Sequence, residues 1–140
     1  MISLIIMGNP VAKQRPKFAR TGNFAKTYTP IKTANYENLI KMVFARDYQD
    51  FEPLRTPVNM HITSYHQIPK SPAGGKKTKA RMELNDIRPT KKPDIDNIIK
   101  IACDALNGVA YADDRQIVGV FAQKFYSTIP RVEIEIEEIE

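Results

Sequence analysis

The fold and the chemistry both begin in the stretch Lys91-Lys92-Pro93-Asp94-Ile95-Asp96-Asn97-Ile98-Ile99-Lys100. It places two carboxylates two residues apart, with lysines on both sides, at the start of an apolar repeat. From Ile95 to Leu106 the apolar residues recur with the i, i+3, i+4, i+7 spacing of one helical face. Asn107-Gly108 is typical of a helix end, and Pro93 of a helix beginning. We therefore expect a helix from about Asp96 to Asn107.

The backbone just before this helix determines whether the two carboxylates can meet. Successive helical residues turn by about 100°, so a helical Asp94 would point about 200° away from Asp96. In an extended lead-in, residues i and i+2 share a face, and the two carboxylates converge. Lys100 lies one helical turn beyond Asp96, so its ammonium group can reach the same place.

A second acidic pair, Asp113-Asp114, follows the helix after a short loop. A returning strand can bring this loop back beside the helix start, which makes Asp114 or Asp113 a candidate third carboxylate. Mg²⁺ prefers such oxygen ligands at about 2.0–2.1 Å and completes its shell with waters and substrate phosphate oxygens. Phosphodiester cleavage fits this chemistry. The alternative is a capped helix with an Asp96–Lys100 surface pair worth about 0.3–0.5 kcal/mol, since Asp-x-Asp often occurs by chance.

Length and charge limit the class of protein. The chain has 140 residues, of which 42% are hydrophobic, enough for one domain with a core over residues 1–140. All basic residues precede Val132, whereas five acids lie in the last eight positions. Residues 1–132 thus hold 21 basic and 11 acidic residues, a net charge of +10, which favours a polyanionic partner.

The cysteine, the histidines and the apolar runs of the sequence exclude several kinds of site. The single cysteine, Cys103, allows neither an internal disulfide nor a cysteine zinc site, and we expect it to be packed. His61 and His66 lie in a strand-like run without other ligands nearby, and we expect no chemical role for them. The N-terminus lacks the features of a signal peptide, and no 18-residue apolar run exists. We expect a cytoplasmic protein without a membrane partner or an organic cofactor.

Four strands and a further helix complete the expected core. The apolar run Ile2–Met7 predicts an inner strand buried on both faces. A helix is expected from Pro30 to about Tyr48, and strands over 58–65, 117–126 and 131–139. These elements predict an α+β fold, in which a mixed or antiparallel sheet of about four strands packs against two main helices.

Two basic segments are candidates for DNA contact. The turn-rich residues between Gly8 and Tyr28 combine basic and aromatic side chains, which suit phosphate contact and base stacking. The alternative is a solvated loop whose aromatics anchor it to the core. Residues 69–92 form a basic segment, flexible in its first half, with a short helix over 77–84. The DNA-binding candidates are Lys13, Arg15, Lys17, Arg20, Lys70, Lys76, Lys77, Lys79, Arg88, Lys91 and Lys92.

These motifs together resemble a known family. The runs Ile87-Arg88-Pro89-Thr90-Lys91-Lys92-Pro93-Asp94-Ile95-Asp96-Asn97, Asp104-Ala105-Leu106-Asn107-Gly108 and Ala112-Asp113-Asp114-Arg115-Gln116-Ile117 closely resemble the RusA family of Holliday junction resolvases. Residues 8–17 and Pro69-Lys70-Ser71 are similar to it as well. The likeness spans almost the whole chain, and one departure is Lys17, where the family's Arg-Pro-Arg motif has arginine.

The resemblance implies an endonuclease that depends on Mg²⁺, with Mn²⁺ a candidate substitute. It implies an intertwined homodimer that makes paired, symmetric nicks in a four-way DNA junction during DNA recombination and repair, in a host or in a phage or prophage. The family's essential acids correspond to Asp94, Asp96 and Asp114, with Asp113 weaker, and its catalytic lysine to Lys100. As a hypothesis, the acids hold one ion, or two ions about 3.5–4 Å apart, while Lys100 neutralises charge on the phosphate.

Two other interpretations use the same residues. A nuclease of the PD-(D/E)xK type needs an acid-x-lysine triplet on a downstream strand, whereas Asp96 and Lys100 lie four apart on a helix. A non-catalytic, structure-specific DNA-binding protein would use the carboxylates only to pair with Lys91, Lys92 and Lys100. A metal-dependent nuclease that acts on other branched DNA also remains open.

Overall fold

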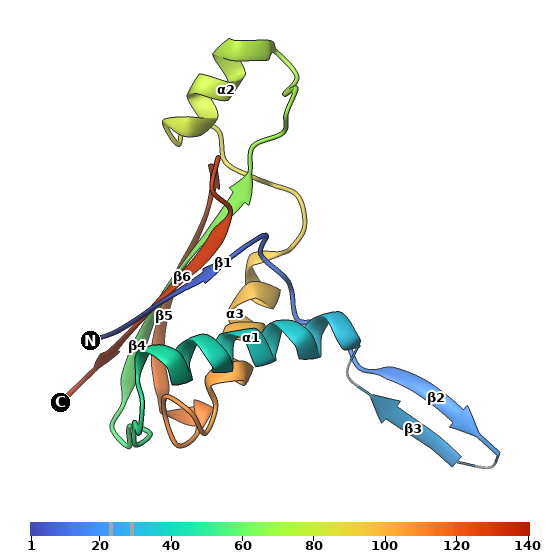
Figure 1. Cartoon of the computed structure of the whole chain (residues 1–140), viewed down its shortest axis with the longest axis vertical. Coiled ribbons are helices and arrows are strands. Elements are labelled where there is room, and N and C mark those ends of the chain that lie inside the picture. The colour runs from blue at the N-terminus through green and yellow to red at the C-terminus, as the bar shows by residue number, and fades with distance from the viewer. Residues whose placement is uncertain (23, 29) are drawn as a thin grey trace.

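Four strands form one mixed sheet in the order β1-β6-β4-β5 (Figure 1). The computed structural model describes residues 1–22, 24–28 and 30–140. The strands of the sheet are β1 (Ile2–Met7), β4 (Val58–Gln67), β5 (Ile117–Ser127) and β6 (Arg131–Glu138). Strand β6 runs antiparallel to both β1 and β4, whereas β4 and β5 are parallel. A parallel pair needs a crossover connection, and the chain between β4 and β5 supplies it.

Helices α1 (Ile31–Asp47) and α3 (Ile95–Leu106) pack on one face of this sheet (Figure 1). Alternate residues of β1, β4 and β6 point toward the helices and are buried, as the period of a half-buried strand requires. Each fully buried large apolar side chain contributes about 1.5–3 kcal/mol. The core they share includes Leu4, Ile6, Ile40, Phe44, Met60, Ile62, Ile98, Ile101, Leu106, Ile134 and Ile136. The sequence-based α+β class and the four-stranded mixed sheet are confirmed.

Helix α3 begins and ends within one residue of the predicted bounds. Its N-cap, Asp94, is extended, with φ −69° and ψ 147°, which is the lead-in that lets Asp94 and Asp96 share a face. After the C-cap Asn107, Gly108 adopts a left-handed φ of +76°, the conformation in which glycine commonly ends a helix. The start of α3 is therefore fixed by its own sequence.

The prediction for the first strand was wrong in its position. Strand β1 lies at an edge of the sheet and pairs with β6. Only one of its faces is buried, so that Ile5 and Met7 are 50% and 58% exposed. A short apolar run does not reveal how many layers cover it, and the helices cover just one face here.

The first basic segment forms a hairpin where we expected a loop. Strands β2 (Lys17–Thr21) and β3 (Phe24–Tyr28) pair with each other and project from the body of the molecule (Figure 1). Phe18 is 77% exposed, so its ring does not anchor the hairpin to the core. The hairpin therefore offers basic and aromatic side chains to a partner.

The second basic segment contains helix α2 (Gly75–Glu83), close to the short helix predicted there. Met82 is the buried residue of this helix, while its lysines are exposed. No helix in the described part of the chain has the length and apolar character that crossing a membrane requires.

His66 is buried near the end of β4, where its Nε2 lies 2.8 Å from Ser64 Oγ. Burial, and then the nearby Lys124 and Lys91, lower the pKa of His66 to about 4. The unfolded chain takes up this proton near pH 6.5, before the folded chain does. His66 therefore stabilises the fold fully above about pH 6.5, and that contribution is lost as the pH falls toward 4.

We predict that His66 contributes about 2–3 kcal/mol to the loss of unfolding free energy between pH 7.5 and 4.5. Urea unfolding at both pH values measures this loss. His66→Gln should reduce the loss by that amount. The matched control His61→Gln, at an exposed position on the same strand, should keep it. Equal pH dependence in His66→Gln and the wild type would contradict the assignment.

Candidate active site

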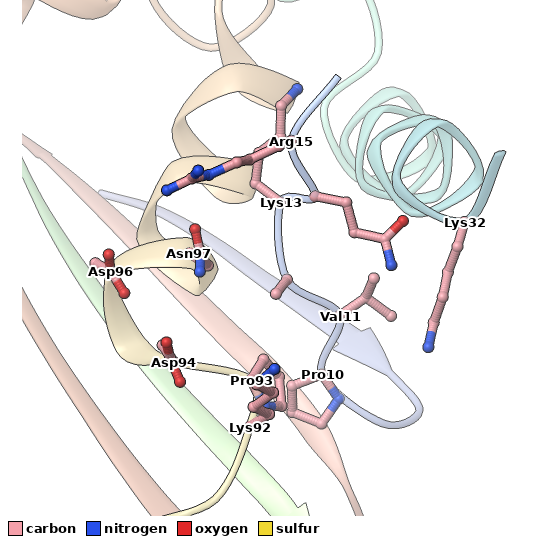
Figure 2. A pocket seen from close by; sticks show the side chains of 12 residues that line it. Pro10, Val11, Lys13, Arg15, Lys32, Lys92, Pro93, Asp94, Asp96 and Asn97 are labelled. Atoms are coloured by element: carbon pink, nitrogen blue, oxygen red, sulfur yellow. The ribbon is translucent and has the colours of Figure 1, made fainter. Parts of the chain in front are cut away.

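A cleft of about 700 Å³ opens where the N-terminal segment crosses the start of α3 (Figure 2). Three parts of the chain form it: residues 10–15, the first turn of α1, and residues 92–97. In Figure 2 the guanidinium of Arg15 lies beside the first turns of α3, and Asp94 and Asp96 lie at the start of the same helix. The lining residues are Pro10, Val11, Ala12, Lys13, Gln14, Arg15, Lys32, Lys92, Pro93, Asp94, Asp96 and Asn97.

The carboxylates of Asp94 and Asp96 are exposed and uncommitted. Aspartate at an N-cap usually accepts a hydrogen bond from the first turn, but the Asp94 side chain makes no such bond. Among the described residues, neither aspartate forms an ion pair with a lysine or arginine. The capped-helix alternative and the lysine-pairing alternative both required these missing contacts. The carboxylates are therefore free for a ligand from outside the chain.

Lys13 ties the N-terminal segment to both helices. Its ammonium group pairs with Glu37 of α1 and lies 3.3 Å from Asp104 of α3. Its backbone N–H donates to the carbonyl of Asn97, 3.2 Å away. Burial lowers the pKa of Lys13 and the two carboxylates raise it, with a net rise. Two acids distant in sequence thus neutralise much of the Lys13 charge, and its contact with DNA stays a prediction.

Asp113 and Asp114 separate into two roles. Asp113 caps the short helix η1 (Asp114–Gln116): its carboxylate accepts from the Arg115 N–H at 3.0 Å, and this bond lowers its pKa. Asp114 is exposed. Burial, and then the charges of Asp104 and Asp114, raise the pKa of Cys103 to about 11. Asp114 is thus the freer of the two acids.

The predicted third carboxylate is not gathered with the first two. No group of three or more His, Cys, Asp or Glu side chains in residues 1–22, 24–28 and 30–140 is placed to hold a metal ion. Mg²⁺ can be held by one or two carboxylates plus waters and phosphate oxygens, so Asp94 and Asp96 fit it as a pair. The participation of Asp114 stays a prediction.

The other predicted residues are spread around this cleft. Lys100 is exposed on α3, one turn beyond Asp96 and outside the cleft lining. Arg15 and Lys92 line the cleft, whereas Arg88 and Lys91 contact strand β5. The remaining candidates are exposed: Lys17 and Arg20 on the hairpin, Lys76, Lys77 and Lys79 on α2, and Lys70 before it.

Two lysines near the site were missed by the sequence reasoning. Lys32 lines the cleft from the start of α1, and nothing in the sequence marks it. Lys124 lies on β5, where its ammonium donates to the Lys91 carbonyl at 2.7 Å. A lysine inside an otherwise apolar strand was the available signal for the second.

Residues 7–137 match the family model described as Endodeoxyribonuclease RusA. The chain belongs to the RusA family. A Bacillus subtilis relative, Uncharacterized protein YqaN, is 36% identical over 138 residues, which cover 99% of this chain and 96% of the relative. The resemblance found in the sequence is thereby confirmed. Membership in the RusA family implies an endodeoxyribonuclease that acts on branched DNA such as junctions.

We predict that Lys13→Met lowers the free energy of unfolding by about 1–3 kcal/mol, because it leaves Glu37 half-buried without its cation. Lys17→Met, at an exposed position on the hairpin, is the matched control and should stay within about 0.5 kcal/mol of the wild type. Urea unfolding at pH 7 measures both. Equal effects of the two substitutions would show that Lys13 does not tie the helices together.

Proposed function

We propose that this protein is a Mg²⁺-dependent endodeoxyribonuclease that resolves Holliday junctions by paired nicks. The observation that carries the proposal is the pair of exposed, unpaired carboxylates, Asp94 and Asp96, in a cleft that Arg15, Lys32 and Lys92 make basic. Acidic side chains without a salt-bridge partner can hold a metal ion, and the basic side chains beside them can bind a phosphate group. Membership in the RusA family supports the same reaction.

The proposed chemistry divides the work among the residues of the cleft. Asp94 and Asp96, with Asp114 brought closer, would hold Mg²⁺, which when bound supplies an activated water and polarises the scissile phosphate. Arg15 and Lys92 would hold the phosphates on either side of it. Lys100 would place a positive charge where negative charge develops on the phosphate. The products would carry a 5′-phosphate and a 3′-hydroxyl, and Mn²⁺ is a candidate substitute for Mg²⁺.

The distribution of charge supports a long DNA substrate. In the view of Figure 1 the start of α3 lies between the β2–β3 hairpin and α2, two elements that carry five of the eleven predicted DNA contacts. Glu133, Glu135 and Glu137 alternate with the buried residues of β6 and therefore face away from the helices. Phosphate groups on both sides of the scissile bond would therefore meet lysine and arginine.

Two copies are needed for paired nicks in one encounter. A two-fold dimer matches the two-fold symmetry of a junction, and we propose a homodimer for that reason. Ile5, Met7 and Phe121, the last 58% exposed, leave apolar area on the sheet that a second copy can cover. The projecting hairpin suits an intertwined arrangement. The proposed setting is DNA recombination and repair in the cytoplasm.

We predict that the purified protein nicks a synthetic four-way junction in Mg²⁺, but not in EDTA, and leaves a matched duplex and a single strand intact. Asp94→Asn should lower the cleavage rate at least about 100-fold. Its Kd for the junction should stay the same or fall, because the substitution removes a negative charge near phosphate. The control Asp47→Asn, whose aspartate pairs with Arg46 on the surface, should cleave normally.

A binding protein without activity would give a different pattern. Tight junction binding with no nick at any Mg²⁺ concentration, together with normal binding by Asp94→Asn, would refute the nuclease proposal. Cleavage of other branched DNA at equal rates would keep the nuclease and refute the preference for four-way junctions.

We predict that junction binding weakens with salt as phosphate neutralisation requires. If about eight phosphates are contacted, log K should fall against log salt with a slope near −7. Replacing Lys76, Lys77 and Lys79 together with glutamine should make this slope shallower by about 2–3, because three contacts are lost. A wild-type slope shallower than about −2 would exclude the basic segments as the DNA surface.

A further inference from the structure

Residues 88–91, which lead into Asp94, are attached to strand β5 by two reciprocal contacts. Arg88 Nε donates to the carbonyl oxygen of Lys124 at 2.8 Å, and Lys124 Nζ donates to the carbonyl oxygen of Lys91 at 2.7 Å. Arg88 also donates to Gln123 Oε1 at 3.1 Å. We name Arg88, Lys91 and Lys124 the loop clamp. The loop contributes the Arg88 side chain and the Lys91 carbonyl, and β5 contributes the Lys124 side chain and the Lys124 carbonyl.

Aromatic side chains of the sheet hold the Arg88 end of the loop clamp. The guanidinium carbon lies 4.2 Å from the centroid of the Phe125 ring, and that ring stacks on Tyr65 at 5.9 Å. Arg131 covers the Tyr65 ring at 3.9 Å. The loop is thus anchored on β5, and the stacked rings and Arg131 support Phe125 from β4 and β6.

The loop clamp restricts the position of Asp94. Lys91 precedes Asp94 by three positions, so its fixed carbonyl limits where Asp94 can lie. The Asp94 side chain makes no capping bond to α3, so the helix does not orient it. Burial lowers the pKa of Lys124, and Asp94 offsets only part of this effect. Lys124 is linked to Asp94 through the Lys91 carbonyl and the loop that follows it.

We propose that Lys124 is a positioning residue of the candidate active site: by holding the Lys91 carbonyl, it fixes Asp94 beside Asp96. This inference rests on the proposed function. It separates Lys124 from Lys100, because the Lys124 ammonium is used within the protein, whereas Lys100 is exposed. It also gives Arg88 a structural part in the site, in addition to the DNA contact predicted from the sequence.

Two effects of Lys124 on Mg²⁺ have opposite signs, which makes its role measurable. A cation near Asp94 repels Mg²⁺, so loss of the charge alone would lower the Mg²⁺ requirement. Loss of the loop clamp would let Asp94 move away from Asp96 and raise the Mg²⁺ requirement. Substituting a residue that orients a metal ligand typically weakens metal affinity or activity about 10–100-fold. The positioning role therefore predicts a rise.

The test compares Lys124→Met, Lys124→Arg and the control Lys41→Met, which removes a charge from an exposed position on α1. Single-turnover junction cleavage is titrated with Mg²⁺, junction binding is measured in EDTA, and the rate of limited trypsin cleavage after Lys91 is followed by mass spectrometry. Lys124→Met should raise the half-saturating Mg²⁺ concentration at least about tenfold and speed trypsin cleavage after Lys91, with unchanged binding. Lys124→Arg should recover most of the loss, and Lys41→Met should match the wild type.

Three outcomes would overturn the inference. A lower Mg²⁺ requirement in Lys124→Met would show a purely electrostatic effect. Weaker junction binding with an unchanged Mg²⁺ requirement would make Lys124 a phosphate contact. Unchanged trypsin cleavage after Lys91 would show that the loop clamp does not hold the loop, even if the wild type proves inactive and the proposed function fails. If Lys124→Met does not fold, Arg88→Met removes the other half of the loop clamp, and the comparison then uses the Mg²⁺ requirement and trypsin cleavage after Lys91, because Arg88 is also a predicted DNA contact.

Discussion

The parallel pairing of β4 with β5 constrains the rest of the molecule. Parallel neighbours cannot be joined by a tight turn, so the chain from 68 to 116 must leave the sheet and return to its starting edge. The return is possible because α3 buries an apolar stripe against the sheet, with Ile98, Ile101 and Leu106 in the core. The site is assembled around this crossover: its acids lie at the start of α3, Lys92 precedes them, and Arg15 and Lys32 come from the N-terminal segment and α1.

Burial of charged side chains is costly, and the crossover keeps the charged side chains of the site exposed to water. Asp94, Asp96 and Lys100 lie on exposed parts of α3, while the opposite side of the helix supplies core contacts. The paired charges lie deeper: Lys13 joins α1 to α3, and its side chain is 18% exposed. The buried charge of Lys13 is therefore paired within the protein, whereas the exposed charges of the site stay available to a metal ion or a phosphate group.

The local sequence pattern was enough to predict helix α3, but not the position of β1 or the hairpin. Helix α3 has a strong apolar period, an extended Asp94 and a glycine end, and its bounds were predicted within one residue. The edge position of β1 was missed because apolar residues point to both of its faces, although only one face is covered. The hairpin was missed because its short strands are basic and turn-rich.

The finer part of the site depends on contacts that no local pattern reports. Lys13 meets Glu37 from 24 residues away, and Lys124 meets Lys91 from 33 residues away. Such pairs exist only once the helices and strands are packed. Asp114 shows the same limit: its motif is clear, but the described residues contain no group of three such side chains placed to hold a metal ion.

The central claim is that Asp94 and Asp96 together hold a divalent ion. Crystals of the wild type soaked in Mn²⁺, compared with crystals of Asp94→Asn, test it through anomalous scattering. The account predicts one peak about 2.1 Å from carboxylate oxygens of both aspartates, absent in the variant. A peak bound elsewhere on the chain, or the same peak in Asp94→Asn, would contradict it.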